Sequence, residues 1–430
     1  MRFEPFWWDD AGAPASPPEE PLPNELDVVI VGAGLTGLSA ARTLARKGKS
    51  VLVLEAEEPG AGASSRNGGM IGGGHRLSID DMEARFGKET ALDLLTEAHL
   101  TSTDFVKQVM IEESIDCDFA ETGRFRGLWQ ASEYDASARG LERLQSLIPL
   151  EAEMIPKSRQ RDEVNTDLYQ GGIVFPRHGG LNPAKWTAGL LSAAQRAGAL
   201  LQGRTPLKAL HKTSSGIDVE TPRGNVRAGQ VLIATNGYTP TVLSEFKRRI
   251  VPIPSYIVAT EPLGTNRIKD LLPGGRMVAE SRERHCYYRA SPDGTRLIFG
   301  GRAALFNAPE PVAQAELRGL MTRIFPQLKG VGFSHSWRGR TGFTFDFLPH
   351  VGETDGVWHA MGYSGSGNAM APYLGHKAAL LMAGDAEGKT AFTKTGFPTR
   401  WWHRGRPWFL PFADLMFRGR DLWNNATRSP

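Results

Sequence analysis

The apolar positions near the N-terminus predict a strand, a helix and a second strand in quick succession. Asp27 to Val31 is a short apolar, β-branched run, typical of a strand that is buried on both faces of a parallel sheet. Apolar residues then recur at helical spacing, at Leu35, Leu38, Ala41, Leu44 and Ala45. Gly48 ends this helix, and Val51 to Leu54 is a second buried strand. The pattern therefore predicts a βαβ unit of a parallel sheet.

Later segments continue the alternation of strands and helices. Helices are predicted from Ile79 to about Glu113, from Tyr134 to Leu147 and from Pro183 to Gly198, and an apolar strand from Gln230 to Thr235. From Val251 to about Gly301 strand signals dominate, which predicts an antiparallel sheet. The segment GVWHAMGYSGSGNAMAPYLGHKAALLMAG predicts a strand, a glycine turn and a helix that ends at Gly384. This last segment repeats the order of elements in the opening unit.

The turn of the opening unit has the G-x-G-x-x-G spacing, at Gly32, Gly34 and Gly37. The first glycine permits the tight turn, the second lets backbone N–H groups approach a pyrophosphate, and the third lets the helix lie close to the strand. The helix N-terminus then directs its free N–H groups at the phosphates. Glu55 closes the second strand, where a carboxylate accepts hydrogen bonds from a ribose 2′-hydroxyl and repels a 2′-phosphate. The segment therefore predicts FAD or NAD as ligand rather than NADP.

A glycine- and serine-rich loop, PGAGASSRNGGMIGGGHR, follows the second strand. The length of this loop indicates a functional role rather than a simple crossover. Its position in the chain brings Ser64, Ser65, Arg66, Asn67 and Gly68 beside the dinucleotide. Small residues allow close backbone approach to a flat ring, and Arg and Asn side chains can bind phosphate or ring heteroatoms.

Composition limits the class of protein. At 430 residues the chain is long enough for two interleaved domains, and 23% charged with 40% hydrophobic residues is typical of soluble globular proteins. A net charge of +3 is too small to indicate nucleic-acid binding. Cys117 and Cys286 can form neither a disulfide framework nor a thiolate metal site, which suits a cytoplasmic protein, and the histidine spacings predict no metal. We expect neither a signal peptide nor a membrane-spanning segment.

Both ends of the chain carry aromatic residues. Residues 1–23 are rich in proline and acidic residues and predict an extended lead-in, anchored to the body by Phe6, Trp7 and Trp8. The C-terminal tail, residues 386–430, mixes aromatic residues with arginines. We expect this tail to pack across the body. The alternative is a peripheral contact with the inner face of a membrane, as an interfacial helix would make.

Several motifs in a fixed order resemble the FAD-dependent oxidoreductases of the D-amino-acid oxidase superfamily. They are VVIVGAGLTGLSAARTLARKGKSVLVLEA, GASSRNGGM, HGGLNP, VLIATNGY, YYRASPDGTRLIFGGR, FPQLKGV and MGYSGSGNAM, with a W-x-G pattern at Trp337 and a D-x-x-P-x-x-G pattern at Asp346. The match covers nearly the whole chain from Asp27 to Gly384 and is most similar to the branch that includes γ-glutamylputrescine oxidase.

The resemblance implies a mixed α/β fold. A Rossmann-like FAD-binding domain of the p-hydroxybenzoate-hydroxylase type would be interleaved with a substrate domain built on an antiparallel sheet. The FAD-binding domain would comprise residues 24–85, 170–240 and 335–385, and the substrate domain residues 86–169 and 241–334.

The resemblance also implies which residues bind FAD. The Gly32, Gly34 and Gly37 turn with Glu55 would hold the ADP half, and the turn from Gly362 to Asn368 would lie at the pyrimidine end of the flavin. A helix N-terminus that opens there would stabilise the negative charge of reduced flavin. The expected FAD-binding residues are Gly32, Gly34, Leu35, Thr36, Gly37, Glu55, Ala56, Ser64, Ser65, Arg66, Asn67, Gly68, Gly69, Met70, Thr235, Gly362, Gly365, Ser366, Gly367 and Asn368. Arg66 stands where some relatives carry a flavin-linking histidine, so we expect non-covalent FAD.

The implied reaction is hydride transfer from a carbon that bears an amine to flavin N5, followed by hydrolysis of the imine. The expected catalytic residues are Tyr287, Tyr288, Arg289, Trp337, Arg340 and Tyr363. Because Tyr287 and Tyr288 point to opposite faces of a strand, only one of them should face the cavity. His285, His335 and His350 are expected to be structural or at the surface.

Three functions fit these residues. The first is an oxidase of amines or γ-glutamylated polyamines, with O2 as electron acceptor and H2O2 as product. The second is an oxidase of D-, N-methyl or cyclic amino acids, or a dehydrogenase that feeds a respiratory electron carrier. A buried Arg paired with a Tyr would indicate an amino-acid substrate, and Arg289, Arg302 and Arg340 are candidates. The third is a non-catalytic FAD-binding assembly protein.

Overall fold

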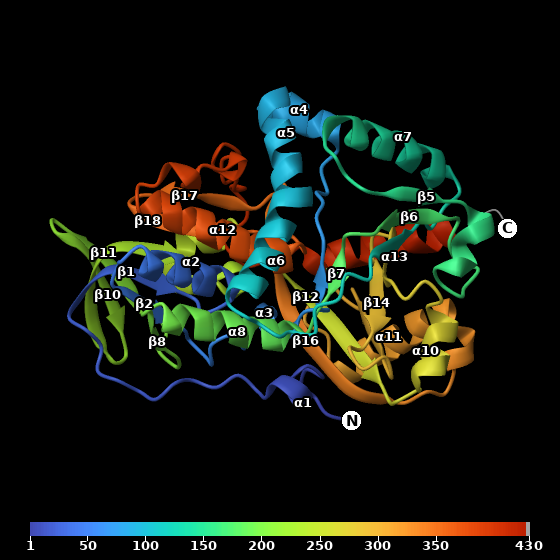
Figure 1. The fold of residues 1–430 in the computed structure, drawn as a ribbon, viewed down its shortest axis with the longest axis horizontal. Helices are drawn as coiled ribbons and strands as arrows, with labels where there is room; N and C mark the ends of the chain where they lie inside the picture. Colours follow the sequence, from blue (N-terminus) through green and yellow to red (C-terminus); the bar gives the residue numbers. More distant parts are fainter. Residues whose placement is uncertain (427–430) are drawn as a thin grey trace.

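Two large β-sheets form the body of the protein. The computed structural model describes residues 1–426, and Figure 1 shows one sheet on the left of the molecule and the other on the right. The chain passes between the sheets several times, so that each sheet is assembled from segments far apart in the sequence. The apolar strands thus form one large sheet at the centre of each half of the molecule.

The left-hand sheet is parallel at its centre. Its strands are β1 (Glu25–Val31), β2 (Val51–Leu54), β8 (Leu200–Gln202), β9 (Ala209–Thr213), β10 (Gly216–Thr221), β11 (Gly224–Ile233), β17 (His350–Thr354) and β18 (Val357–Met361). The strand order is β17-β18-β11-β1-β2-β8, and β9 and β10 continue from β11 as an antiparallel hairpin. The pairs β18·β11, β11·β1, β1·β2 and β2·β8 are parallel, so their carboxyl ends share one edge.

Three long helices cover this sheet: α2 (Leu35–Arg46), α8 (Pro183–Arg196) and α12 (Gly367–Met382). α2 packs against both of the others. The crossing of α2 and α12 is close, because a Cβ on Gly375 would lie 2.2 Å from the Thr36 carbonyl oxygen. α8 begins as its sequence predicts, with the Asn182 side chain accepting hydrogen bonds from the backbone N–H groups of Ala184 and Lys185.

The right-hand sheet is antiparallel except where β4 pairs with β13. Its strands, in spatial order, are β16 (Phe333–Phe343), β12 (Val251–Thr260), β15 (Leu297–Gly301), β14 (Cys286–Ala290), β13 (Met277–Glu280), β4 (Arg124–Gly127), β6 (Gly172–Phe175) and β5 (Glu153–Ile155). One face carries Phe125, Tyr288 and Phe299, which are buried against α10 (Thr265–Leu271) and α11 (Glu310–Ile324). The opposite face turns toward the parallel sheet.

The remaining elements connect and flank the two sheets. They are α1 (Trp8–Ala11), α3 (Ala63–Arg66), α4 (Ile79–Phe86), α5 (Lys88–Thr96), a π-helical turn (Glu97–Thr101), α6 (Ser102–Glu112), α7 (Ser132–Leu147), α9 (Ser244–Lys247), α13 (Leu410–Ala426), and the two-stranded pair β3 (Met70–Ile71) and β7 (Gly179–Gly180). The helical patterns predicted from Ile79 and around Tyr134 correspond to α4 to α6 and to α7. Short 3-10 turns at 157–162, 236–238, 241–243, 326–328, 386–388 and 391–393 complete the chain.

Two expected domain boundaries differ from the observed sheets. We expected residues 335–343 and 172–175 in the FAD-binding domain, yet β16 forms its ladder with β12, and β6 pairs with β4 and β5. The backbone hydrogen bonds of both segments therefore belong to the antiparallel sheet. A strand-like pattern alone does not specify its partner strand, because the same alternation suits either sheet.

Both terminal segments pack on this body. Trp7 is completely buried, and the backbone of Arg2 exchanges hydrogen bonds with Ser334 and Ser336 at the edge of β16. At the other end, Leu410 and its neighbours on the inner face of α13 pack on Val251 and Phe343. The N-terminal aromatic residues thus act as the anchor that the sequence predicts.

Candidate active site

An elongated cavity of about 350 Å³ opens at the carboxyl ends of the parallel strands. Val31, Leu54 and Ala234 line it where β1, β2 and β11 end, and the N-terminal turn of α2 faces it. Ligands of open α/β sheets bind at this edge, outside the carboxyl ends of the strands. The position is therefore that of a dinucleotide site.

The glycines of the opening turn are required by close contacts. Gly32 has φ +108°, and a Cβ there would lie 2.9 Å from the Ala234 carbonyl oxygen. A Cβ on Gly34 would lie 2.8 Å from Ser64 Oγ, in the space that faces the cavity. A Cβ on Gly37 would lie 2.0 Å from the Gly32 carbonyl oxygen, so Gly37 serves the packing of α2 on the turn. The cradle fits a pyrophosphate that approaches the bare backbone.

Glu55 stands at the end of β2 and faces the same cavity. Its carboxylate accepts hydrogen bonds from the backbone N–H groups of Ala33, at 2.9 Å, and Glu57, at 3.1 Å. Burial raises the pKa of Glu55, although these hydrogen bonds oppose the rise. The carboxylate is therefore fixed in the orientation that ribose hydroxyl recognition needs.

A second cavity, of about 220 Å³, adjoins the first. The residues that line both are Ala63, Asn67, Arg340, Thr341, Gly365 and Asn368. At this junction the Asn67 and Asn368 side chains exchange hydrogen bonds of 3.0 and 2.8 Å. A flat ring that is continuous with the dinucleotide would lie at this junction, with the second cavity free for a substrate beside it.

The second cavity is strongly basic. Its arginines are Arg66, Arg76, Arg124, Arg302 and Arg340, and among the described residues no Asp or Glu lines it. Arg302 is buried, and burial together with the charge of Arg76 lowers its pKa to about 9. Burial also lowers the pKa of Arg124 to about 10. A cavity in which guanidinium groups lack counter-ions fits an anionic ligand.

Tyr287 and His285 face the same cavity from β14 and the residue before it. The Tyr287 hydroxyl is 2.9 Å from Ser255 Oγ, and burial raises the pKa of Tyr287 to about 12. Burial and the positive charges of Arg302 and Arg76 hold the pKa of His285 well below its ordinary value. At neutral pH Tyr287 is therefore a hydrogen-bond donor and His285 is an uncharged imidazole.

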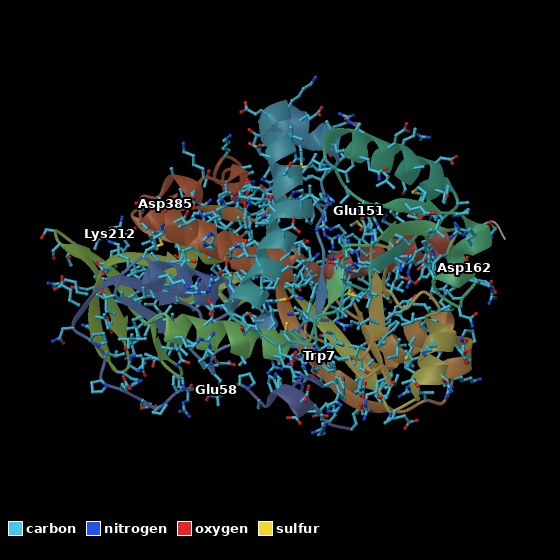
Figure 2. The ribbon with its side chains drawn as sticks, in the orientation of Figure 1. Trp7, Glu58, Glu151, Asp162, Lys212 and Asp385 are labelled. Carbon is cyan, nitrogen blue, oxygen red and sulfur yellow. The ribbon has the colours of Figure 1, made fainter. Side chains whose placement is uncertain are left out.

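Residues 66–69 form the loop between the two cavities, and three side chains bind the backbone carbonyl oxygens of this loop. Trp337 Nε1 donates to the Arg66 carbonyl oxygen at 2.8 Å, and Trp7 Nε1 donates to the Asn67 carbonyl oxygen at 2.8 Å. Arg289 donates to the Gly69 carbonyl oxygen at 2.6 Å. Figure 2 shows Trp7 beneath the middle of the molecule, between its two halves. The N-terminal segment therefore contributes directly to the geometry of this loop.

Most of the sequence-predicted cofactor residues line one of the two cavities. They are Gly32, Gly34, Leu35, Thr36, Glu55, Ala56, Ser64, Arg66, Asn67, Gly68, Met70, Thr235, Gly365, Ser366, Gly367 and Asn368. Of the predicted catalytic residues, Arg340 lies at the junction, Tyr287 in the second cavity and Tyr363 in the first. The Tyr363 hydroxyl lies 2.7 Å from Thr36 Oγ1, which joins the two helix N-termini that face the site.

The other predicted residues lie behind the cavities. Tyr288 is in the core of the antiparallel sheet, where its hydroxyl lies 2.9 Å from that of Tyr169, because β14 alternates and Tyr287 takes the cavity side. Trp337 and Arg289 line neither cavity and bind loop carbonyl oxygens, so their catalytic roles stay predictions. Four residues expected to bind FAD, namely Gly37, Ser65, Gly69 and Gly362, line neither cavity, so their contact with the cofactor stays a prediction.

Several lining residues were missed by sequence reasoning. Arg76 and Arg124 face the second cavity, as does His285, which we expected to be structural. Asn236 and Tyr238 line the first, and Asn236 Oδ1 accepts a hydrogen bond from the Gly362 N–H. Asn236 also has φ +41°, a strained conformation for a side-chain-bearing residue. Its place after an apolar strand was the available signal, whereas nothing local marks Arg76 or Arg124.

The two adjoining cavities define the site of a flavin-dependent oxidoreductase. A model of the family described as FAD dependent oxidoreductase, DAO, matches residues 27–381. The chain therefore belongs to this family, and the predicted cofactor, FAD, and enzyme class are confirmed.

Known relatives cover most of the chain. The protein named "Probable oxidoreductase OrdL" of Rhizobium meliloti is 34% identical over 88% of this chain and 88% of its own. The γ-glutamylputrescine oxidoreductase of Escherichia coli is 30% identical over 90% of this chain and 90% of its own. The glycine oxidase structure from Geobacillus kaustophilus has a TM-score of 0.73 at 22% identity, covering 88% of this chain and 99% of that one. This structural likeness confirms the predicted mixed α/β fold.

Two other features of the described residues bear on ligands and location. Within residues 1–426, no group of His, Cys, Asp and Glu side chains is arranged to hold a metal ion. Among the described helices, none combines the length and the apolar character needed to cross a bilayer.

Proposed function

We propose that the enzyme oxidises the C–N bond of an amine that carries a carboxylate, that is, an amino acid or an N-substituted amino acid. The observation that carries this proposal is the second cavity, which is lined by five arginines and, among the described residues, by no Asp or Glu. Arg302, which is buried, and Tyr287, which is partly buried, both line this cavity, and an Arg together with a Tyr in one pocket indicates an amino-acid carboxylate.

Each lining residue has a role in this proposal. FAD, when bound at the junction, supplies the hydride acceptor. Arg302 and the protonated Tyr287 hydroxyl bind the substrate carboxylate and so orient the C–H bond next to the nitrogen. The amine must be neutral before it is oxidised, and burial and the positive charges of Arg302 and Arg76, which keep His285 uncharged, also favour loss of the substrate ammonium proton to water. The resulting imine is hydrolysed by water to a carbonyl compound and a free amine.

The N-terminus of α12 is placed to stabilise the negative charge that develops on the flavin during the reaction. α12 begins at Gly367, which lines the first cavity, and Gly365 and Asn368 line the junction of the two. The unpaired N–H groups of a helix N-terminus stabilise negative charge placed before them. This turn therefore supports reduction at the junction. The flavin is held without a covalent link, since Arg66 occupies the loop position of the flavin-linking histidine and His75 lines neither cavity.

A γ-glutamylated polyamine is the second candidate substrate. The 30% identity to the Escherichia coli γ-glutamylputrescine oxidoreductase favours it, and the glutamyl carboxylate could bind Arg302. Its amine end, however, would enter a cavity that offers five guanidinium groups and, among the described residues, no carboxylate. Like charges repel in a desolvated space, so the amino-acid class is favoured over polyamines.

Anaerobic bleaching of the flavin tests the proposal. The FAD-loaded protein is mixed with N-methyl, cyclic, D- and dicarboxylic amino acids, with putrescine, and with γ-glutamylputrescine. We expect bleaching by at least one carboxylated amine and none by putrescine. Bleaching by putrescine alone would contradict the proposal. If none of these compounds bleaches the flavin, the non-catalytic assembly function is favoured instead.

We propose O2 as the electron acceptor, with H2O2 as the product. Admission of air to the bleached enzyme is expected to restore the flavin absorption and to release stoichiometric peroxide. Restoration only after addition of a quinone would instead favour a dehydrogenase that feeds a respiratory carrier. The same spectrophotometer trace therefore separates the two acceptors.

We also propose a peripheral membrane contact through the C-terminal segment. Leu410 lies on the buried face of α13, whereas Phe412 and Leu415 on its other face are each 67% exposed, and Trp401 is 90% exposed. Arg404 and Arg406 are exposed in the same segment, which suits an anionic lipid surface.

Vesicle sedimentation tests this contact. The protein is expected to bind vesicles rich in phosphatidylglycerol at low salt, and to bind phosphatidylcholine vesicles less. Trp401→Ser combined with Phe412→Ser should reduce binding about 10-fold or more, because two buried aromatic insertions are lost. Ile111→Ser, which removes an exposed apolar side chain from α6, is the matched control. Complete recovery of the wild-type protein in the supernatant would contradict the proposal.

A further inference from the structure

The arginines of the second cavity fall into two groups. Arg302 and Arg76 form the first group, since their guanidinium carbons lie 5.3 and 5.4 Å from the ring centroid of Phe343. Arg124 lies apart from them, with its guanidinium carbon 5.5 Å from the ring centroid of Phe175. One cavity thus has two separate centres of positive charge.

The sheet separates the backbone positions that carry Arg302 and Arg124. Arg302 follows β15 and Arg124 begins β4, and β14 and β13 lie between these strands. Three interstrand steps of about 4.8 Å therefore separate them across the sheet. The register also shifts the two arginines along the strand direction. Cys286 pairs with Gly301, Tyr288 with Val278, and Met277 with Arg124, so Arg124 lies about four residues, or about 13 Å, further along than Arg302. The side chains extend from these separated backbone positions into one cavity of about 220 Å³, where a ligand with two anionic groups can contact both.

The Arg124 side chain lacks an acceptor. Its NH2 group donates to the Gly73 carbonyl oxygen at 3.3 Å, but its Nε is buried without a hydrogen-bond partner. None of the described carboxylates forms an ion pair with Arg124. An unsatisfied donor on a charged group is costly to bury, so the geometry points to a ligand that supplies the missing acceptor.

The neighbours of Arg124 cannot supply the negative charge. Burial and the charge of His75, followed by that of Arg124, lower the pKa of His99 to about 3, and burial and Arg124 hold the pKa of His178 well below its ordinary value. Both imidazoles are therefore neutral at pH 7. Lys107, which also acts on His178, is paired with Glu121. The positive charge of Arg124 is thus left for a bound anion.

We propose that the substrate is a dianionic amine, with one carboxylate bound by Arg302 and Arg76 and a second anionic group bound by Arg124. This inference rests on the proposed function for the first carboxylate and adds the second. The chemical class is an amino acid whose nitrogen or side chain carries another carboxylate. The chemistry at the nitrogen is the same, so the second group contributes only binding and orientation.

A matched pair of small amines tests the second site. Sarcosine and iminodiacetate differ by one carboxylate in place of a hydrogen on the N-methyl carbon. With the FAD-loaded enzyme we expect kcat/KM for flavin bleaching to be at least about 10-fold higher for iminodiacetate. Arg124→Met should lower kcat/KM for iminodiacetate about 100-fold and leave sarcosine within about 3-fold, and Arg124→Lys should restore part of the loss. Arg338→Met, an arginine on β16 that is paired with Glu310, is the control.

Two results would overturn the inference. The first is equal use of both amines by the wild-type enzyme. The second is an equal loss for both in Arg124→Met, which would assign Arg124 to support of the Gly73 loop.

A binding measurement keeps this test independent of turnover. Glutarate and butyrate, which cannot be oxidised here, are titrated while the flavin absorption spectrum is recorded. Tighter binding of glutarate that Arg124→Met abolishes supports the inference even if neither amine bleaches the flavin, in which case the proposed oxidation alone fails. Equal binding of glutarate and butyrate overturns the inference, whatever the outcome for the amines.

Discussion

Arg302→Met is expected to raise KM for carboxylated amines about 100- to 1,000-fold while the protein retains its FAD. The buried guanidinium provides charge-assisted hydrogen bonds to a carboxylate, and removal of one partner of a buried ion pair costs about 3–5 kcal/mol. Methionine keeps much of the side-chain volume, so the packing on Phe343 is largely retained. KM in steady-state peroxide assays and the flavin-to-protein absorbance ratio are the measurements.

The pattern across variants separates binding from folding. Arg338→Met removes a guanidinium from the neighbouring strand β16, half-exposed and outside the cavity, and should leave KM unchanged. Arg302→Lys should recover only part of the loss, because an ammonium group cannot form the planar bidentate contact. An unchanged KM in Arg302→Met, with normal FAD content, would show that the carboxylate is bound elsewhere.

Local patterns in the sequence were sufficient for the dinucleotide site. The turn at Gly32, Gly34 and Gly37 lies within a single βαβ unit, so its spacing already specifies a contact between neighbouring residues. The distant turn at Gly365 and Gly367 is likewise a glycine turn before a helix. Of these five glycines, all but Gly37 line the first cavity. A motif whose own backbone groups bind the ligand can be recognised from the sequence, because its function does not depend on which distant segments pack against it.

The basic cavity could not be predicted in the same way. Arg76 lies in a loop, Arg124 on β4 and Arg302 after β15, so only the strand order of the antiparallel sheet brings them together. Arg302 was one of three candidates for a carboxylate site, but Arg76 and Arg124 gave no signal, because an arginine in a strand or loop is usually a solvated surface residue. The alternation of Tyr287 and Tyr288 predicted that one of them faces the cavity, but which one depends on the side that α10 and α11 cover.

The N-terminal arm shows a similar limit. Three consecutive aromatic residues predicted an anchor, yet their sequence does not say what they anchor. The structure answers this, since Trp7 binds the loop at Asn67 and Trp8 Nε1 donates to Ser65 Oγ at 3.2 Å. The arm lies outside the region that matches the family model, residues 27–381, so the family motifs gave no indication of its role.

Trp7→Ala is expected to raise the dissociation constant of FAD about 100-fold or more. The Trp7 indole is completely buried, packs edge-on against Trp337 with ring centroids 6.4 Å apart, and donates to the Asn67 carbonyl oxygen. Truncation of a buried tryptophan to alanine costs about 3–5 kcal/mol. The truncation leaves an empty space directly behind the loop of residues 66–69. Much of the cost therefore falls on the ordering of Asn67, which lines both ligand cavities.

A graded series decides whether the arm acts on the loop or only on the fold. Trp7→Phe keeps ring packing and removes the indole donor, so FAD binding should weaken about 5- to 15-fold, by about 1–1.5 kcal/mol. Trp401→Ala removes a tryptophan that is 90% exposed and should leave binding unchanged. FAD release on dilution, followed by flavin fluorescence, gives the dissociation constants, and thermal melting of the FAD-free protein gives the stability of the fold. If Trp7→Phe and Trp7→Ala lower the melting temperature but retain FAD as the wild type does, the arm stabilises the body and not the loop. An increase from wild type through Phe to Ala in the dissociation constant, larger than the melting shifts explain, assigns Trp7 to the flavin site itself.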